Sequence, residues 1–157
     1  MILYRLVPLS HASTAFSGEG AYRYGGRWNS PGVRVVYTSS SVALAVLEVL
    51  AYRKPRRPLA QRCLFRVILP DRQLSRISAE TLPEDWNAYP YPESTQLVGD
   101  AWVERGGTVA LAVPSVLAPP EQNVVLNCEH PAFADLRIEG PEDFPFDPRL
   151  APDARRQ

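Results

Sequence analysis

The segment Phe16-Ser-Gly-Glu-Gly-Ala-Tyr-Arg-Tyr-Gly-Gly-Arg-Trp-Asn29 is the densest concentration of glycine, aromatic residues and arginine in the chain. Its Gly-x-Gly pair would begin a dinucleotide-binding fingerprint only if a strand preceded it and a helix followed it directly. Instead the chain continues through Asn29-Ser-Pro-Gly32 into a β-branched run, which argues against a Rossmann fold. Five glycines and Pro31 between residues 17 and 32 predict a shaped loop there.

Short apolar runs on both sides of this loop predict the secondary structure. The serines at 39–41 are candidate N-caps for a helix, and Pro55 and Pro58 would end it. Residues 71–92 are interrupted by prolines and predict turns with one short helix. We therefore expect six strands, at 2–7, 33–38, 62–69, 108–113, 123–127 and 134–139, and two main helices, at 42–52 and 95–104.

The order of these elements indicates the fold class. Strands and helices do not alternate regularly along the chain, which favours an α+β arrangement over a doubly wound parallel sheet. The second helix is expected to be amphipathic, with one packed face and one solvent-facing face. Its apolar face would comprise Leu97, Val98, Ala101 and Trp102, its polar face Gln96, Asp100 and Glu104, and Gly106-Gly107 would end it.

The composition fits a globular domain without a strong charge. The 157 residues predict one domain over 1–150 with a polar tail at 151–157. Basic and acidic residues number 17 each, so no global field attracts nucleic acid, and direct DNA or RNA binding is disfavoured. Two cysteines give no disulfide framework, and neither a signal peptide nor a membrane-length apolar run is visible. We expect a cytoplasmic protein.

Arginine side chains in the glycine-rich segment are candidates for ligand binding. Glycines let backbone amides approach a ligand closely, and Arg23 or Arg27 could hold a phosphate through two parallel hydrogen bonds. The alternative is a glycine-rich hairpin in which Trp28 packs on the core. Spacing alone leaves both interpretations open.

Glu48 is the second candidate. It is the one charge in the segment Val42-Ala-Leu-Ala-Val-Leu-Glu-Val-Leu-Ala51, which is apolar on every side and therefore predicts a buried helix. A buried carboxylate loses solvation worth several kcal/mol unless a partner compensates for it. An arginine or a ligand hydroxyl would do so. The alternatives are a purely structural Glu–Arg ion pair, or a helix whose Glu48 edge meets solvent.

Other combinations of reactive residues are weaker. His11 and His130 are the only histidines, and with Cys128 they supply at most two neighbouring ligands, so no metal site is expected. Ser115 lacks the Gly-x-Ser-x-Gly context of a hydrolase nucleophile. The basic run at 53–57 is interpreted as a solvated loop rather than a nucleic-acid patch.

Taken in order, the motifs of this chain resemble the RES-domain family. The resemblance covers residues 2–150, and several spaced motifs in one order are more specific than any single motif. One departure is Cys128, where the family more often has proline, and we expect it to alter only a local turn. The matching motifs are Tyr4-Arg5, Phe16-Ser-Gly-x-Gly-Ala21, Gly26-Arg-Trp-Asn-x-x-Gly32, Val36-Tyr37, Ala45-x-x-Glu48, Val113-Pro-Ser115, Asn127-x-x-His130-Pro131 and Phe144-x-Phe-Asp-Pro-Arg149.

The resemblance implies a toxin of a bacterial toxin–antitoxin pair, with an ADP-ribosyltransferase-like mixed or split β-sheet and a few helices. Such toxins consume NAD as a substrate. Their antitoxin carries an Xre-like helix-turn-helix domain, so DNA would be contacted only through the antitoxin. Carried over by position, the residues of the NAD pocket are Arg5, Arg27, Tyr37, Glu48 and Ser115, of which Glu48, Arg27 and Ser115 would be catalytic.

A mechanism follows from these assignments. Breaking the nicotinamide–ribose bond builds positive charge on the anomeric carbon, and the desolvated Glu48 carboxylate would stabilise it. Arg27 and Arg5 would hold the pyrophosphate or the ribose hydroxyls. Tyr37 would contact the nicotinamide end, and Ser115 the amide or the ribose.

Two questions stay open at the level of the sequence. The acceptor of ADP-ribose decides between an NAD glycohydrolase (water), an NAD phosphorylase (phosphate) and a protein ADP-ribosyltransferase (a side chain). A non-catalytic nucleotide-binding or protein-interaction module is the alternative from another class, and a toxin acting on RNA is a further one. An antitoxin that covers the pocket would require apolar surface around its mouth.

Overall fold

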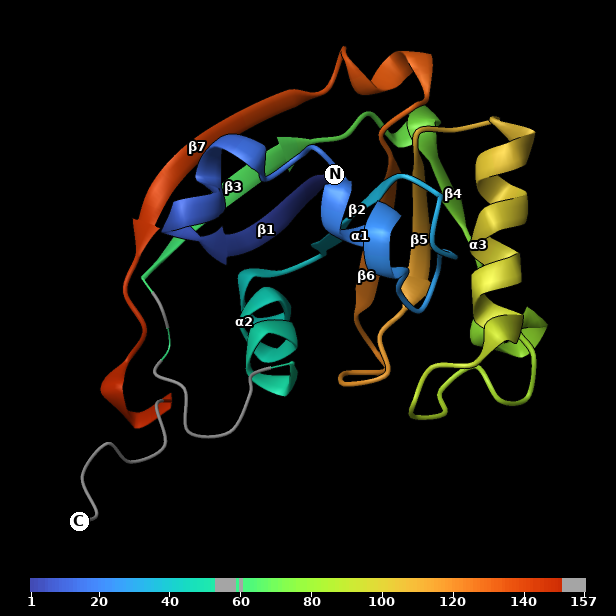
Figure 1. The fold of residues 1–157 in the computed structure, drawn as a ribbon, viewed down its shortest axis with the longest axis horizontal. Helices are drawn as coiled ribbons and strands as arrows, with labels where there is room; N and C mark the ends of the chain where they lie inside the picture. The colour runs from blue at the N-terminus through green and yellow to red at the C-terminus, as the bar shows by residue number, and fades with distance from the viewer. Residues whose placement is uncertain (53–58, 60, 151–157) are drawn as a thin grey trace.

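The computed structural model describes residues 1–52, 59 and 61–150, which form a mixed seven-stranded sheet in the order β4-β5-β6-β2-β1-β3-β7 (Figure 1). Every strand pair is antiparallel except β4–β5, and the few helices lie outside the sheet, so the predicted α+β class is confirmed. The strands are β1 (Ile2–Pro8), β2 (Val35–Ser39), β3 (Arg62–Ile68), β4 (Leu74–Arg76), β5 (Ala110–Pro114), β6 (Gln122–Asn127) and β7 (Arg137–Phe144), and the helices are α1 (Glu19–Tyr24), α2 (Val42–Ala51) and α3 (Glu93–Arg105).

The sheet is divided into two halves at the junction of β1 and β2. These strands pair at a single position, Tyr4 opposite Ser39, whereas β1 and β3 pair at seven positions and β2 and β6 at five. One half therefore consists of β1, β3 and β7, and the other of β2, β6, β5 and β4. Figure 1 shows these halves at the left and right of the molecule.

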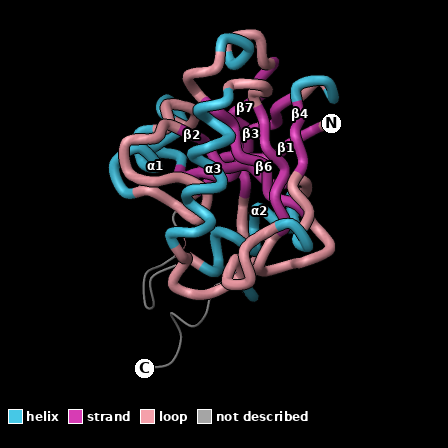
Figure 2. The backbone as a smooth tube through the Cα atoms, turned by 90° about the vertical axis from the view of Figure 1, so that its right-hand side faces the viewer, coloured by secondary structure: helices cyan, strands magenta, loops and turns pink. Residues whose placement is uncertain are grey.

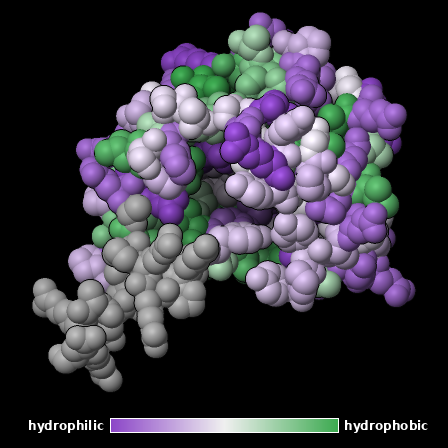
Figure 3. Space-filling model, viewed as in Figure 1, coloured by the Kyte–Doolittle hydropathy of each residue, from purple (hydrophilic) through white to green (hydrophobic). Residues whose placement is uncertain are grey.

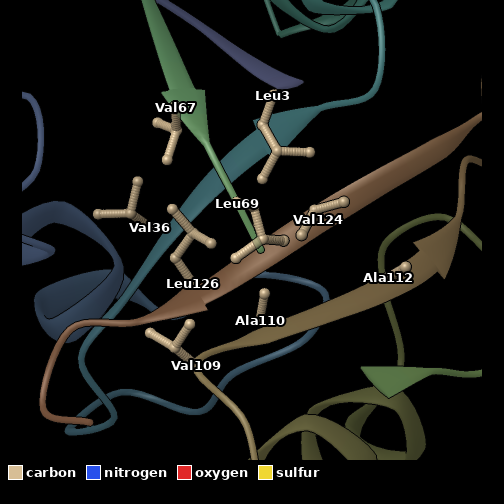
Figure 4. Close-up of a cluster of buried hydrophobic side chains, with 9 residues drawn as sticks. All are labelled: Leu3, Val36, Val67, Leu69, Val109, Ala110, Ala112, Val124 and Leu126. Atoms are coloured by element: carbon tan, nitrogen blue, oxygen red, sulfur yellow. The ribbon is translucent and has the colours of Figure 1, made fainter. Parts of the chain in front are cut away.

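Both faces of the central strands are covered. This explains their continuous apolar sequences, because a strand buried on both sides does not alternate between apolar and polar residues. On one face α3 and the residues around Trp28 pack over Val35, Leu111 and Val125, and Figure 2 shows α3 running along the sheet. The opposite face carries the cluster in Figure 4, formed by Leu3, Val36, Val67, Leu69, Val109, Ala110, Ala112, Val124 and Leu126.

Helix α2 has the predicted bounds but not the predicted burial. Ser41 caps its N-terminus by accepting a hydrogen bond from the Leu44 amide at 3.0 Å. Only Leu44 and Ala45 are buried within the helix, and 38% of Leu47 is exposed. The prediction of a fully buried helix is therefore wrong, because α2 packs against the sheet with one side only.

Helix α3 also differs from its prediction. Trp102 is buried as expected, but 58% of Leu97 is exposed, and the other buried positions are Thr95 and Gly99. The expected polar face is partly turned inward, where Gln96 donates to two loop carbonyls. The helix is oriented by the close approach of Gly99 to the Trp28 backbone, where a Cβ atom would overlap the carbonyl.

Smaller corrections concern the loop and the strands. The glycine-rich segment contains the short helix α1, bounded by Gly18 and Gly25 in positive-φ conformations of 67° and 69°. Strand β4 was not predicted, and β7 extends to Phe144 instead of ending at residue 139. The basic run at 53–57 and the tail at 151–157 lie outside the described residues. Among the described helices, none has the length and apolar character needed to span a bilayer.

Candidate active site

Three consecutive serines fasten the start of α2 to the β5–β6 hairpin. The Ser39 hydroxyl donates to Asn123 Oδ1 at 3.0 Å, the Ser40 amide donates to the Gln122 carbonyl at 3.0 Å, and the Ser41 hydroxyl donates to the Glu121 carboxylate. The helix therefore leaves β2 with its first turn tied to the neighbouring hairpin. Glu48 lies two turns further along α2 and is thereby placed beside β6.

The Glu48 carboxylate is held from β6. Asn123 Nδ2 donates to Glu48 Oε1 at 2.5 Å, a short and charge-assisted contact. Burial raises the pKa of Glu48 above its ordinary value, and the Asn123 hydrogen bond opposes the rise by favouring the ionised form. Glu48 is thus a partly desolvated carboxylate with a fixed orientation.

Ser115 lies at the end of β5, fully buried at 0% exposure. Its Oγ accepts hydrogen bonds from the Leu117 amide at 3.2 Å and the Ala118 amide at 3.1 Å. These contacts shape the turn after β5 and leave the hydroxyl proton free to be donated elsewhere. The Ser115 hydroxyl also lowers the pKa of Glu48, as expected for a donor beside a carboxylate.

Arg27 reaches the same region from the glycine-rich loop. Its Nη1 donates to the carbonyls of Trp86 at 2.7 Å and Ala88 at 3.0 Å, so Arg27 orders the loop before α3. Its positive charge lowers the pKa of Glu48, but among the described residues no ion pair joins the two. A simple Glu48–Arg27 ion pair therefore does not explain the partly buried carboxylate.

Tyr37 contacts the loop that carries Arg27 through its hydroxyl group. Its hydroxyl donates to Asn29 Oδ1 at 2.7 Å and accepts from the Trp28 amide at 3.0 Å. Burial raises the pKa of Tyr37, so the hydroxyl keeps the proton that it donates. The Tyr37 hydroxyl therefore helps to hold the loop that carries Arg27, together with the hydrogen bonds that the Asn29 and Gln96 amides donate to backbone carbonyls.

Arg5 lies apart from Glu48, Ser115 and Arg27 but contacts the Tyr37 backbone. On β1 it alternates with Tyr4 and Leu6, which face α2, so Arg5 projects from the other side of the strand. Its Nε donates to the Ala15 carbonyl at 2.7 Å and its Nη1 to the Tyr37 carbonyl at 2.7 Å. Burial lowers the pKa of Arg5 to about 10, which still leaves it charged at neutral pH.

A hollow of about 120 Å³ adjoins Arg5 and is lined by Ser17, residues 18–21 and Tyr37. Tyr37 lines this hollow and also accepts a hydrogen bond from the Trp28 amide, so it links the Arg5 hollow to the loop that carries Arg27. The structure therefore brings Arg27, Glu48, Ser115 and Tyr37 together and places Arg5 next to them, with no direct contact to Arg27, Glu48 or Ser115 within the described residues.

Sequence reasoning missed Asn123 and the tyrosines beside the site. Asn123 is a polar residue at the start of an apolar strand, two positions before the buried Val125, and that position was the available signal. Tyr52 is 65% exposed, yet the Glu48 charge contributes, after burial, to a raised pKa of its hydroxyl. Tyr89 and Tyr91 belong to the loop that Arg27 orders and contribute to the same rise.

The space-filling view shows a hollow near the centre of one face of the molecule (Figure 3). Exposed apolar side chains occur on the elements that surround Glu48, namely Leu47 and Tyr52 on or next to α2, Tyr89, and Leu117 after Ser115. In the described part of the chain, no three histidine, cysteine or acidic side chains gather as metal ligands would. The site is a carboxylate held by uncharged donors, with an arginine nearby.

Comparison with known proteins gives consistent relationships. A family model described as "RES domain" matches residues 2–147. The chain is 37% identical over 151 residues to "Toxin Res" of Yersinia enterocolitica, covering 96% of this chain and 99% of that protein. It is 35% identical over 137 residues to "Prs ADP-ribosylating toxin" of Sphingobium sp., covering 85% of each.

A solved structure shares the fold. The toxin–antitoxin complex MbcT–MbcA of M. tuberculosis contains a chain that matches with a TM-score of 0.71 and 20% sequence identity, covering 91% of this chain and 83% of that one. At this identity the likeness concerns the arrangement of the sheet and helices.

Proposed function

This chain belongs to the RES domain family of toxins, and on that basis we propose that it breaks the nicotinamide–ribose bond of NAD and transfers ADP-ribose to an acceptor. We further propose that residues 1–150 act as one RES domain in the cytoplasm, where NAD would be consumed. NAD is the substrate, and no metal takes part in the mechanism that follows.

The observation that carries the proposal is the state of Glu48. Its carboxylate is partly desolvated, is oriented by Asn123, and has no ion-pair partner among the described residues. An oxocarbenium-like ribose develops positive charge as nicotinamide leaves, and a pre-oriented carboxylate stabilises that charge more strongly in a shielded site than in water. We assign this task to Glu48.

The other residues are assigned from their contacts. Both loop carbonyls accept from Nη1 of Arg27. The remaining N–H groups of the guanidinium are proposed to hold a phosphate or ribose oxygen. Ser115 Oγ accepts two backbone amides, and its hydroxyl proton is proposed to be donated to Glu48 or, when NAD is bound, to the ribose. Tyr37 positions the Arg27 loop, and the diphosphate end of NAD is proposed to extend past Tyr37 toward Arg5.

The decisive experiment is Glu48→Gln, which keeps the shape of the side chain and an oxygen that Asn123 can reach. We expect NAD turnover to fall by about 10²-fold or more, a loss typical for removal of a preorganised electrostatic contact. Glu104→Gln, on the exposed side of α3, is the matched control and should turn over NAD at the wild-type rate. Equal rates for wild type and Glu48→Gln would contradict the proposal, and intact NAD with the wild type would favour a non-catalytic nucleotide-binding module.

A product assay identifies the acceptor. Purified protein is incubated with NAD labelled in the adenine moiety, in buffer alone, with inorganic phosphate, and with cell lysate. Free ADP-ribose indicates water as acceptor, a phosphorylated ADP-ribose indicates phosphate, and label retained on a protein band indicates a side chain. RNA integrity in cells that express the toxin tests the remaining alternative.

An antitoxin is the proposed protein partner. The relatives named above are toxins, and the solved relative was determined with its antitoxin. Leu47, Tyr52, Tyr89 and Leu117 supply the apolar surface that such a partner would cover next to Glu48. We propose an antitoxin with an Xre-like helix-turn-helix domain, through which alone the complex would bind DNA. Its addition should suppress NAD turnover, and Leu47→Asp should weaken that suppression.

A further inference from the structure

We infer that Asn123 is a positioning residue for Glu48, and that Ser39 holds the Asn123 amide in place. The inference rests on the proposed function, because it assigns Asn123 to the same reaction. Three elements contribute to the arrangement: Ser39 ends β2, Asn123 is near the start of β6, and Glu48 is on α2.

The orientation of the amide follows from its two contacts. Asn123 Oδ1 accepts the Ser39 hydroxyl proton at 3.0 Å, and Nδ2 donates to Glu48 Oε1 at 2.5 Å. A carboxylate only accepts hydrogen bonds, so the amide nitrogen is the end that must face it. The reversed amide would bring Oδ1 against the carboxylate and exchange an attraction for a repulsion.

The sheet makes this donor rigid. Ser39 and Asn123 are directly opposite each other in the β2–β6 ladder, so their side chains lie on the same face and are neighbours by register. Glu48 by contrast belongs to a helix that packs with one side only and ends at Ala51. Asn123 is therefore held by the sheet, and through its hydrogen bond it fixes the Glu48 side chain, which belongs to the less extensively packed helix α2.

The contact also determines how readily Glu48 ionises. Burial opposes ionisation, whereas the Asn123 amide, the Arg27 charge and the Ser115 hydroxyl favour it. Among the described residues, burial and then the Glu48 charge also raise the pKa of the Tyr52 hydroxyl, so Glu48 and Tyr52 are electrostatically linked. Without the Asn123 donor the balance shifts toward the protonated form, in which Glu48 cannot stabilise a developing cation.

The first test compares Asn123→Ala with Gln122→Ala, whose side chain contacts exposed Arg76 rather than the site. For Asn123→Ala we expect kcat for NAD to fall about 10-fold or more, with little change in KM. In the plot of kcat against pH, the acid limb should move to higher pH. Gln122→Ala should keep the wild-type profile. If Asn123 had only a structural role, Asn123→Ala would lower the yield or the Tm of the protein and leave the acid limb of the kcat–pH profile unchanged.

The second test is Asn123→Asp. Two carboxylates at hydrogen-bonding distance share one proton over a range of pH. The variant should therefore be active only at pH values at which the Asp side chain is protonated, because its O–H then replaces the N–H that Asn123 donates to Glu48. The activity of Asn123→Asp should therefore decline on the alkaline side relative to the wild type measured in the same buffers. Ser39→Ala removes the hydroxyl that holds Asn123 Oδ1, so the amide is less firmly placed and kcat should fall by a smaller factor.

A measurement without substrate separates the two proposals. Titration of the Glu48 carboxyl carbon by NMR in the wild type and in Asn123→Ala should show a higher pKa in the variant. If the wild type leaves NAD intact, the proposed function fails, but this titration still tests the contact. If NAD is consumed and neither the titration nor the acid limb responds to Asn123→Ala, the inference is wrong.

Discussion

At the scale of single residues, the site contains groups whose burial opposes stability. Glu48 is partly desolvated, and Asn123, Arg27 and Ser115 do not fully cancel that effect, because the pKa of Glu48 remains raised. A carboxyl whose folded-state pKa lies above its unfolded value favours folding at low pH. That contribution is lost as the pH rises through the folded-state pKa. Functional sites commonly show such an exchange of stability for activity.

Glu48→Gln should therefore raise the thermal midpoint at pH 8, where the wild-type carboxylate is ionised in a partly buried position. At pH 4 the wild-type group is largely protonated, and the difference between the two proteins should shrink. Calorimetry at the two pH values measures both effects, with Glu104→Gln as the control that changes neither. A lower Tm for Glu48→Gln at pH 8 would contradict this account.

Tyr37→Phe removes the hydroxyl that bridges Trp28 and Asn29. Two buried polar groups lose their partner, so the free energy of unfolding should fall by about 1–3 kcal/mol in urea titrations. Tyr24→Phe is the control, because Tyr24 is 76% exposed and its substitution should leave unfolding unchanged. NAD affinity should fall as well, since the Arg27 loop loses its support. An unchanged unfolding free energy would show that the bridge is dispensable.

At the scale of elements, α3 is positioned by a glycine. Gly99→Ala places a Cβ atom against the Trp28 carbonyl, so α3 and the loop that carries Trp28 must move apart. Alanine favours helices over glycine by about 1 kcal/mol, but we expect the overlap to outweigh this and to destabilise the protein by about 1–3 kcal/mol. Gly20→Ala in α1 meets no atom within 4 Å and should be neutral or stabilising. Chemical denaturation of the two variants compares these outcomes, and equal stabilities would refute the packing argument.

The sequence predicted elements where local preference and tertiary packing agree. Strands β1, β2 and β3 are apolar runs with clear boundaries, and the Ser41 cap marks the start of α2. Strand β4 was missed because its three residues become a strand only by pairing with β5. A three-residue run carries no periodicity of its own.

The helix faces were predicted less well. An α2 that is apolar all round gives no sign of which side is covered, and the exposed side became visible only in three dimensions. In α3 the buried positions include Gly99, which has no side chain to mark an apolar face. The polar Gln96 points inward because the carbonyls of Gly26 and Asn29 need a donor there.

The site was predicted in part for the same physical reason. Glu48 is conspicuous in the sequence because it is a single charge among apolar neighbours. Asn123 is an ordinary polar residue at a strand start, and its importance arises from a contact with a residue 75 positions away. Spacing along the chain shows groups on one element, but a pair assembled across the sheet requires the register.

At the scale of the whole molecule, Arg5 joins the two halves of the sheet. It projects from β1 and donates to Tyr37 on β2, close to the single residue pair by which these strands meet. Arg5→Met would leave two carbonyls without a donor, and we expect a loss of roughly 2 kcal/mol or more in unfolding free energy. Arg66→Met removes an exposed pair with Glu142 and should cost less than about 1 kcal/mol.

Hydrogen exchange locates the effect of Arg5→Met. Amides of β2 should exchange faster in this variant, because β2 depends on Arg5 at its junction with β1, while amides of β7 should be unaffected. Faster exchange spread evenly over all strands would instead indicate general destabilisation.

The distance along the chain between Glu48 and Asn123 also bears on how a cell makes this protein. A ribosome adding about 5–20 residues per second needs roughly 4–15 s to travel the 75 residues between them. Until Asn123 has emerged and β6 has paired with β2, the carboxylate has no fixed position. On the proposed mechanism, a nascent chain, or a fragment released by premature termination before residue 123, should therefore not consume NAD. The proposed activity would begin only with a nearly finished polypeptide, which leaves that interval for an inhibitory partner to bind.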